Sequence, residues 1–381
     1  MELLGGGLQQ AAGARLQKAL QSLTGVPVMG VILGALVAAT LQSSAATTVM
    51  SVGLVNAGVM TLKQAFSVVM GANVGTTLTA QLIAFNLTGY FTVMIRVFAK
   101  RKKGQFIGQI LLGFGLLMLG MKTLSVAASP LRSSPVFVEF VSRFADNPLL
   151  AVIVGIIFTI IVQSSAATVG ILMVMSSQGL LPLEGAIPVL LGDNIGTCLT
   201  AIVAASRSNT SAKQVALSHV LFNSFGCVIF LVFMPQFIKV VLSISPEGDI
   251  ARQIANSHSA FNVLNTMIFL PLITPFTHLI EKLLPDKDEK ISARPLYLND
   301  NMLANPSIAV LLAEKEVIRM GEVAQKNMRV AVESLAAYDP DKVKYVLEHE
   351  PVVDKLNEEI TRYLTRISEK GLGGTLSAKH M

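Results

Sequence analysis

The chain carries one polar hexapeptide twice, inside stretches that are otherwise strongly apolar. Gln-Ser-Ser-Ala-Ala-Thr occupies residues 42–47 and again residues 163–168. A second polar string, which contains Asn-Val/Ile-Gly-Thr, follows each copy at the same distance, at residues 71–76 and 192–197. Both strings therefore recur at one offset of 121 residues. This pattern predicts an internal duplication in which each copy contributes two polar segments.

The surrounding sequence is that of an integral membrane protein. Hydrophobic residues make up 52% of the chain and charged residues 14%, with a mean hydropathy of +0.60. These values exclude an ordinary soluble domain. The net charge of +6 is interpreted as basic loops that follow the positive-inside rule, and nucleic acid is not expected as a partner. Cys198 and Cys227 lie in apolar runs without the spacing of a disulfide framework or metal site.

The apolar segments on either side of each hexapeptide are too short to cross a bilayer. Residues 26–39 and 48–60 flank the first copy, and residues 148–162 and 169–181 flank the second. A transmembrane helix needs roughly 20 apolar residues. Each pair therefore predicts a re-entrant helical hairpin, whose polar tip lies near the middle of the membrane and must be covered by protein or by a water-filled cavity.

Each second polar string lies inside a segment that is long enough to span the membrane. Glycines, threonines and an asparagine interrupt residues 62–85 and 183–205. Because glycine relaxes the backbone and hydroxyl groups can satisfy freed backbone groups, we expect a broken transmembrane helix in each repeat. Further spans are expected at residues 88–99, 106–121, 214–234 and 259–280.

The number of crossings between the hairpins decides how the repeats are related. If residues 88–99 cross despite Arg96, the number is odd and the second repeat is inverted relative to the first; otherwise the repeats are parallel. The positions of basic residues, such as Lys63 and the cluster at 100–103, favour inversion. The predicted fold is thus an all-α membrane protein with inverted repeats, each with a re-entrant helical hairpin and a broken transmembrane helix.

Four regions follow from these assignments. They are an N-terminal interfacial segment at 1–25, a first transmembrane repeat at 26–105, a second repeat with flanking spans at 106–280, and a cytoplasmic helical domain at 281–381. In the last region we expect a small helical bundle. Its helices are predicted at 307–337, 342–348 and 352–370, with a break at Asp339-Pro340.

The polar strings suit an anion bound together with cations. They contain no Lys or Arg, and Asp193 is their one acid. Hydroxyl and amide oxygens are ligands for a hard cation, while the N–H groups at half-helix N-termini suit an oxyanion. Without an arginine clamp, co-bound cations would have to balance much of the anion's charge. The residues therefore predict cation-coupled transport of an oxyanion.

At these strings, over roughly residues 26–280, the chain resembles the type II sodium-dependent phosphate cotransporters and their bacterial relatives. The resemblance implies that phosphate is contacted by Gln42, Ser43, Ser44, Gln163, Ser164 and Ser165. It also implies that the coupling ion, Na⁺, is coordinated by Thr47, Asn73, Thr76, Thr77, Thr168, Asn194 and Thr197, and we add Asp193 as the acid of this set. The C-terminal region resembles the PhoU-like domain of bacterial relatives.

The chain departs from that family pattern at three points. Ala45 and Ala166 stand where the family often has a third serine, so that each tip lacks one hydroxyl group. Asp193 stands where the first repeat has Ala72, which could strengthen a sodium site or admit a proton. A spanning helix precedes the second hairpin but not the first, so the chain is expected to be truncated at its N-terminus.

The predicted function is sodium-coupled symport of inorganic phosphate across the plasma membrane, with alternating access at the repeat interface. A channel or exporter for phosphate or a related oxyanion, and a phosphate sensor that does not transport, are the alternatives. Because no nucleophile and base are arranged for catalysis, we expect no enzyme activity.

Two features outside the polar strings have simpler interpretations. His219 with Asn223, and His258 with Asn262, are spaced to lie on one helix face and are expected to form interhelical hydrogen bonds. The C-terminal domain could stabilise the protein, form a homodimer, or link transport to phosphate.

Overall fold

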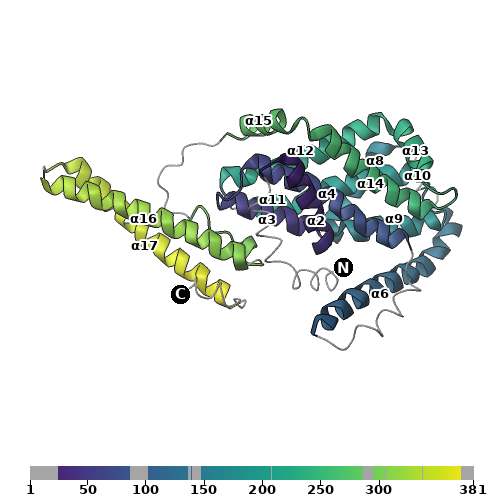
Figure 1. The fold of residues 1–381 in the computed structure, drawn as a ribbon, viewed down its shortest axis with the longest axis horizontal. Coiled ribbons are helices and arrows are strands. Elements are labelled where there is room, and N and C mark those ends of the chain that lie inside the picture. Colours follow the sequence, from purple (N-terminus) through teal and green to yellow (C-terminus); the bar gives the residue numbers. More distant parts are fainter. Residues whose placement is uncertain are drawn as a thin grey trace.

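The computed structural model describes residues 25–85, 102–135, 139, 147–206, 208–285, 295–304, 306–336 and 338–369. Within these ranges the chain is helical and contains no strand, which confirms the all-α prediction. Figure 1 shows a helical body from which a long C-terminal hairpin extends. The interfacial segment expected at 1–25, except for residue 25, lies outside the described residues. So does the span expected at 88–99, on which the count of crossings depends.

Both predicted hairpins are present. The first consists of α2 (Pro27–Leu41) and α3 (Ser44–Asn56), and the second of α8 (Pro148–Val162) and α9 (Ser165–Ser177). A proline opens the first helix of each hairpin, at a position where its fixed φ angle suits a helix and its missing N–H group costs nothing. The two repeats therefore begin their hairpins with the same residue at the same helix position.

Each hairpin turns at a glutamine in the left-handed conformation. Gln42 has a φ angle of 54° and Gln163 one of 55°, and they are the only non-glycine residues with positive φ in the described part of the chain. Such a conformation costs about 1–2 kcal/mol for an L-residue. The following serine then caps the second helix, since the Ser43 hydroxyl accepts a hydrogen bond from the N–H group of Ala46, and Ser164 from that of Ala167.

The helices that carry the second polar strings differ from our expectation. α4 (Leu62–Ala84) runs unbroken through the string at 71–76. In the second repeat, α10 (Leu183–Gly196) and α11 (Cys198–Ala205) are separated only at Thr197, which keeps near-helical angles. The expected break is therefore absent from the first repeat and reduced to one residue in the second.

Close packing explains why these glycines do not break their helices. A Cβ atom on Gly71 would lie 2.0 Å from the carbonyl oxygen of Val31, and one on Gly192 would lie 2.1 Å from that of Val152. The glycines thus allow α4 to lie against α2, and α10 against α8. The threonine hydroxyls donate to carbonyls of their own helix, as Thr76 does to Ala72.

Four further helices complete the body, together with α6 (Lys102–Ala128) and the short η1 (Ser129–Ser133). They are α12 (Thr210–Val232), α13 (Met234–Ser243), α14 (Ile250–Phe269) and α15 (Ile273–Leu283). α14 and α15 are bent by 84° at a short break. The segment expected to span at 259–280 is therefore not one straight helix, because Pro271 lacks the N–H group needed to continue the helix.

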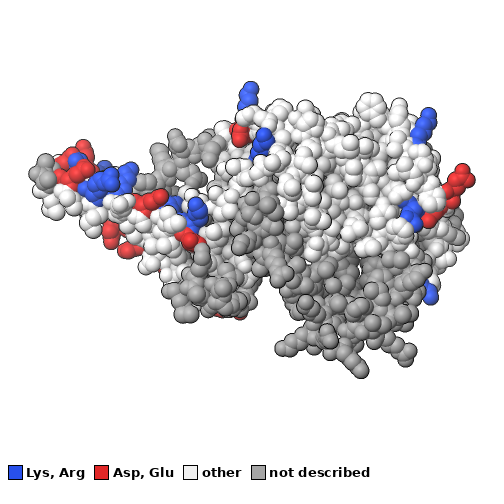
Figure 2. Space-filling model, in the orientation of Figure 1, with Lys and Arg blue, Asp and Glu red and all other residues white. Residues whose placement is uncertain are grey.

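The described residues include three helical segments long and apolar enough to cross a membrane, at 62–84, 183–205 and 210–232, the second of which consists of α10 and α11. Lys, Arg, Asp and Glu gather at the ends of the body and on the C-terminal hairpin, and the visible surface between these ends is largely free of them (Figure 2). This distribution fits a body surrounded by lipid.

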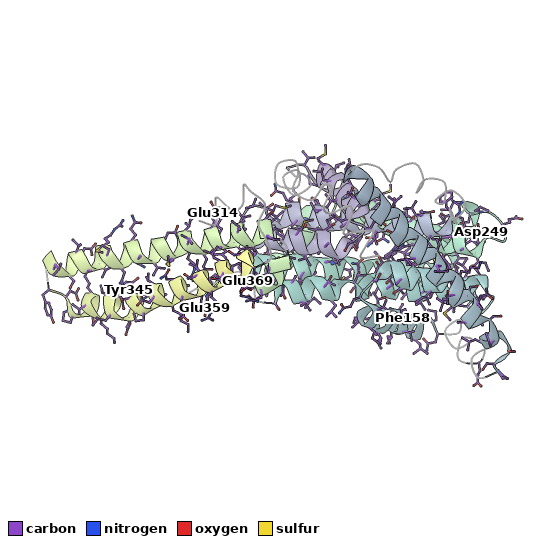
Figure 3. All side chains as sticks on the ribbon, turned by 90° about the horizontal axis from the view of Figure 1, so that it is seen from below. Phe158, Asp249, Glu314, Tyr345, Glu359 and Glu369 are labelled. Carbon is purple, nitrogen blue, oxygen red and sulfur yellow. The ribbon has the colours of Figure 1, made fainter. Side chains whose placement is uncertain are left out.

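The C-terminal region is a helical hairpin and not the expected set of three helices. α16 (Pro306–Ala336) and α17 (Pro340–Ser368) lie side by side (Figures 1 and 3), preceded by η2 (Asp300–Ala304). The break at Asp339-Pro340 is confirmed. The second break is wrong: α17 continues through Pro351, and the stripe of buried side chains on α17 begins directly after the proline, at Val352.

The two hairpins extend in opposite directions from their tips. α3 leads away from Ser44 to Asn56, whose side-chain amide donates to the carbonyl of Tyr297 just before η2. α9 leads from Ser165 to the opposite end, where the side-chain amide of Gln178 donates to Ser125 of α6. We call the first end, next to η2, the tail end of the body. The opposed hairpins are the arrangement of an inverted repeat.

Candidate functional site

The two hairpin tips line one cavity of about 800 Å³. All six residues predicted to contact phosphate contribute to its wall, namely Gln42, Ser43, Ser44, Gln163, Ser164 and Ser165. They come from segments 121 residues apart in sequence. The duplication therefore brings the two hexapeptides to the same place.

The cavity wall is neutral in its side chains but carries two positive helix ends. None of the described residues that line it is charged. α3 and α9 both begin at this cavity. The first N–H groups of a helix have no partner inside the helix, and the helix dipole adds a partial positive charge there. Such a site can hold an oxyanion without a basic side chain.

The tip side chains have different tasks. Ser43 and Ser164 cap their helices. Gln42 is held from both sides, because its Oε1 atom accepts from the Thr79 hydroxyl at 2.6 Å and its Nε2 atom donates to the carbonyl of Ala39 at 2.6 Å. Its counterpart Gln163 is exposed. The two tips thus have the same backbone but are not held in the same way.

The residues predicted to coordinate sodium fall into two groups. Thr76 and Thr197 line the cavity. The others do not reach it and lie in the wall behind it; they are Thr47, Asn73, Thr77, Thr168, Asp193 and Asn194. The structure therefore does not gather all eight residues into one shell.

Asp193 is the centre of a small buried cluster. Its side chain is fully buried, its Oδ1 atom accepts from the Thr159 hydroxyl at 2.7 Å, and Thr159 and Thr168 share a hydrogen bond of 3.2 Å. The Oδ2 atom has no hydrogen-bond partner. A buried carboxylate without a cationic partner is strongly unfavourable. A bound cation with oxygen ligands would supply that partner.

This cluster exists in the second repeat alone. At the offset of 121 residues, Ala72 corresponds to Asp193 and Ala38 corresponds to Thr159. The first repeat therefore has neither the acid nor the hydroxyl that donates to it.

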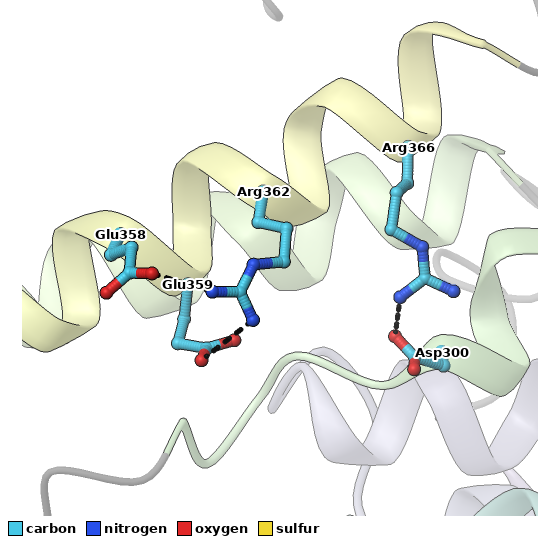
Figure 4. Close-up of polar contacts among 5 residues, drawn as sticks. All are labelled: Asp300, Glu358, Glu359, Arg362 and Arg366. Carbon is cyan, nitrogen blue, oxygen red and sulfur yellow. Dashed lines mark hydrogen bonds and ion pairs between the residues drawn. The ribbon is translucent and has the colours of Figure 1, made fainter.

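The C-terminal region also reaches the cavity. Asn301 of η2 lines it and donates to the carbonyl of Val203 at 2.9 Å. Asn299 is buried and donates at 2.7 Å both to the carbonyl of Ala204 and to the hydroxyl of Ser208. Close by, Arg366 of α17 pairs with Asp300 at 2.6 Å, and Arg362 pairs with neighbouring glutamates (Figure 4).

Sequence reasoning missed a second internal duplication. The pattern Gln-X-Ala-X-Ser-His-X-X-Phe-Asn occupies residues 214–223 of α12 and residues 253–262 of α14. We recognised only the spacing of its histidines and asparagines. Comparing the sequence with itself at a fixed offset, as we did for the hexapeptides, would have identified this second duplication at an offset of 39 residues. The structure places both copies in the buried centre, α12 against α3, α4, α10 and α11, and α14 against α4, α9 and α10.

Opposed hairpins, a polar cavity between their tips, and paired helices around it define a membrane transport protein built from inverted repeats. The chain belongs to the Na⁺/Pi-cotransporter family, whose sequence profile matches residues 1–126 and 133–245. The PhoU domain profile matches residues 317–378. The resemblance drawn from the hexapeptides is thereby confirmed.

Several curated relatives are similar to the chain. Uncharacterized protein YqeW of Bacillus subtilis is 32% identical over 252 residues, which cover 65% of this chain and 82% of YqeW. Putative inorganic phosphate export protein YjbB of Escherichia coli is 27% identical over 374 residues, which cover 96% and 68%. Human sodium-dependent phosphate transport protein 2B is 33% identical over 105 residues, which cover 26% and 15%. No solved structure matches the chain.

Proposed function

We propose that this protein is a sodium-coupled symporter of inorganic phosphate in the cytoplasmic membrane, with alternating access at the interface of its repeats. The observation that carries the proposal is the meeting of two capped helix N-termini, from opposed hairpins, at one uncharged cavity. An anion bound there would contact both repeats at once. A relative movement of the repeats would then change the side from which the anion is reached.

In this proposal the anion is held by backbone N–H groups and by serine hydroxyls. All four hydroxyls can donate, because those of Ser43 and Ser164 use only a lone pair in accepting from the backbone as caps. Ser44 and Ser165 are the pair whose removal would take away a donor without removing a cap. Tetrahedral phosphate presents several acceptor oxygens, so it can accept from both tips together. Gln42 and Gln163 would add side-chain amide contacts.

Sodium is assigned to the wall behind the tips. The unpartnered oxygen of Asp193 lies in the same cluster as Thr159 and Thr168, which follows the tip Ser164 by four residues. A cation held there would stabilise the carboxylate and add positive charge behind the second tip. Phosphate would then bind more strongly when sodium is bound, which is the thermodynamic condition for coupling.

The orientation in the membrane follows from the basic residues. Lys63 lies at the tail end, where its Nζ atom donates to Thr274 of α15, and Lys213 lies in the first turn of α12 near the same end. The positive-inside rule assigns this end to the cytoplasm. The C-terminal hairpin would therefore be cytoplasmic.

Export of phosphate is the second candidate. It is favoured by the similarity to the protein named as a phosphate exporter, which extends over 96% of this chain and includes the C-terminal region. The similarity to the sodium-dependent protein covers 26%.

Uptake into liposomes tests both candidates. Purified protein is reconstituted, and entry of labelled phosphate is measured under an inward sodium gradient and, in parallel, under an equal potassium gradient. The symporter requires uptake that depends on sodium, and equal uptake in both gradients would contradict it. Sulfate and arsenate are run as competing anions to define selectivity.

The second arm measures loss of phosphate from preloaded liposomes. Loss that is independent of sodium, together with no uptake driven by sodium, would favour the exporter. Because reconstituted protein can insert in both orientations, the side of the C-terminal hairpin is determined by protease protection in the same preparation.

A further inference from the structure

The duplicated pattern lies on α12, which packs against α4 with Asn73, and on α14, which packs against α10 with Asn194. In the first repeat, the Nδ2 atom of Asn73 donates to the Oδ1 atom of Asn223 at 2.9 Å, and the Oδ1 atom of Asn73 lies 3.2 Å from the Nε2 atom of His219. All three side chains are buried. Two hydrogen bonds thus fasten α4 to α12, and we call this set the first tie.

The corresponding set in the second repeat consists of Asn194, His258 and Asn262, on α10 and α14. Asn262 repeats one detail of Asn223, since each donates its Nδ2 atom to the carbonyl of the histidine four residues before it. Beyond that detail the sets differ. Asn194 donates its Nδ2 atom to the carbonyl of Leu190 in its own helix, and the Oδ1 atom of Asn262, although buried, has no partner. We call this set the second tie, and we describe it as open because the side chains of Asn194 and Asn262 are not hydrogen-bonded to each other.

The cavity is asymmetric in the same sense. It continues from the tips along α11 toward the tail end, where Leu199, Thr200 and Val203 line it. The corresponding residues of α4, 121 residues earlier, are Leu78, Thr79 and Leu82, and none of them lines the cavity. Thr79 is buried and donates to Gln42, and Leu82 packs against a core that contains side chains of α9. The first tie, which is formed, therefore belongs to the repeat whose α4 does not line this extension of the cavity. The second tie, which is open, belongs to the repeat along whose α11 the cavity extends.

We propose that the two Ser-His-X-X-Phe-Asn motifs are positioning elements that fasten α4 and α10 alternately. The first tie is formed in the state described here, and the second forms, with Asn194 turned toward Asn262, in the state that opens at the other end. Inverted repeats exchange their conformations when access alternates, so the partner that Asn262 lacks here is supplied there. This inference rests on the proposed transport function, because it requires two alternating states.

A cysteine reporter in the cavity tests the alternation directly. Thr200→Cys places a thiol on the wall that faces the cavity, whereas the native Cys198 and Cys227 are buried. Labelling by a membrane-impermeant thiol reagent from the tail end then measures how much of the protein is open on that side. The reporter protein without further substitution gives the reference rate.

The two ties predict opposite results. Asn223→Ala removes one of the two hydrogen bonds of the first tie and destabilises the state described here. One hydrogen bond of about 1 kcal/mol changes a two-state equilibrium constant about fivefold, so labelling should slow by up to about fivefold. Asn262→Ala removes only the second tie, so labelling should be at least as fast as the reference. The double variant should label faster than Asn223→Ala alone, because the losses act on opposite states.

Slower labelling in both single variants, instead of opposite effects, would contradict the proposal. If both single variants slow labelling, or if the double variant is slower than either, the motifs merely stabilise the fold. Asn73→Ala and Asn194→Ala provide a second matched pair, in case an alanine on α12 or α14 prevents folding, and they should behave like Asn223→Ala and Asn262→Ala respectively.

Labelling is measured with neither phosphate nor sodium. A failure of sodium-driven uptake would therefore refute the proposed symport without changing the labelling result. Equal labelling of all variants, in protein that does transport phosphate, would refute the alternation alone.

Discussion

The two repeats share a scaffold but differ in the polar groups mounted on it. Their tip glutamines have φ angles of 54° and 55°, and Gly34 and Gly155 each face a backbone carbonyl at the same close distance. Yet one repeat has Asp193 where the other has alanine, and one tie is formed where the other is open. The backbone of the tips is the same in both copies, while the side chains behind the tips differ.

This difference separates the residues that build the site from those that set its chemistry. Prolines, glycines and capping serines recur at the fixed offset because two hairpins of equal shape require them. The acid of the second polar string has no counterpart in the first, so only the second repeat offers a carboxylate to the proposed cation. The following substitutions test that separation, beginning with the largest expected effect.

Substitution of the scaffold glycines should damage both repeats equally. In Gly34→Ala the new Cβ atom would lie 2.1 Å from the carbonyl oxygen of Val68, and in Gly155→Ala 2.1 Å from that of Val189. Because backbone must move, we expect each to cost about 3 kcal/mol or more, measured as a lower thermal unfolding midpoint in detergent. Gly120→Ala, with no atom within 4 Å of the new Cβ, is the control. A harmless change at either scaffold glycine would break the equivalence of the repeats.

Substitution of the acid should affect sodium dependence. Asp193→Asn keeps the shape of the side chain but removes its charge, so the sodium concentration for half-maximal phosphate uptake should rise about tenfold or more, as expected for loss of an interaction with a charged group. Ala72→Asp, the mirrored change, is the comparison and should not restore the lost dependence in the Asp193→Asn background, because Ala38 offers no hydroxyl. Unchanged sodium dependence in Asp193→Asn would remove this residue from the ion site.

The tip hydroxyls should matter about equally in the two repeats. Ser44→Ala and Ser165→Ala each remove one donor from the cavity wall, and each should raise the phosphate concentration for half-maximal uptake about fivefold, equivalent to a hydrogen bond of about 1 kcal/mol. Competition by unlabelled phosphate measures the effect at fixed sodium. If neither variant changes the phosphate affinity, the tips do not form the substrate site.

The smallest effect is expected where a hydroxyl is added. Ala45 and Ala166 both line the cavity one residue after those serines. Ala45→Ser and Ala166→Ser should change phosphate affinity by less than about threefold, since a new donor gains little where water already satisfies the anion. Titration of phosphate uptake in both variants measures the change, and a large effect at one tip alone would show that the tips are not equivalent.

Sequence alone predicted the hairpins, their tips and the meeting of the hexapeptides, because proline, glycine and capping serine act locally and the fixed offset relates the copies. It did not predict an unbroken α4, since Gly71 permits either a break or a close approach, and only the position of α2 decides. It likewise missed the bend at Pro271. The ties on α12 and α14 depend on which helix faces Asn73 and Asn194, which is a property of the assembled body.

The contact of η2 with the cavity has a consequence for how the chain can be divided. The membrane part and the C-terminal hairpin match different family profiles, yet Asn299 and Asn301 supply the donors for the carbonyls of Ala204 and Val203. A membrane part ending before residue 295 would lose these two hydrogen bonds and, with Asn301, a piece of the cavity wall. The boundary between the two modules therefore lies after η2, and a truncation intended to isolate the transporter must retain residues 295–304.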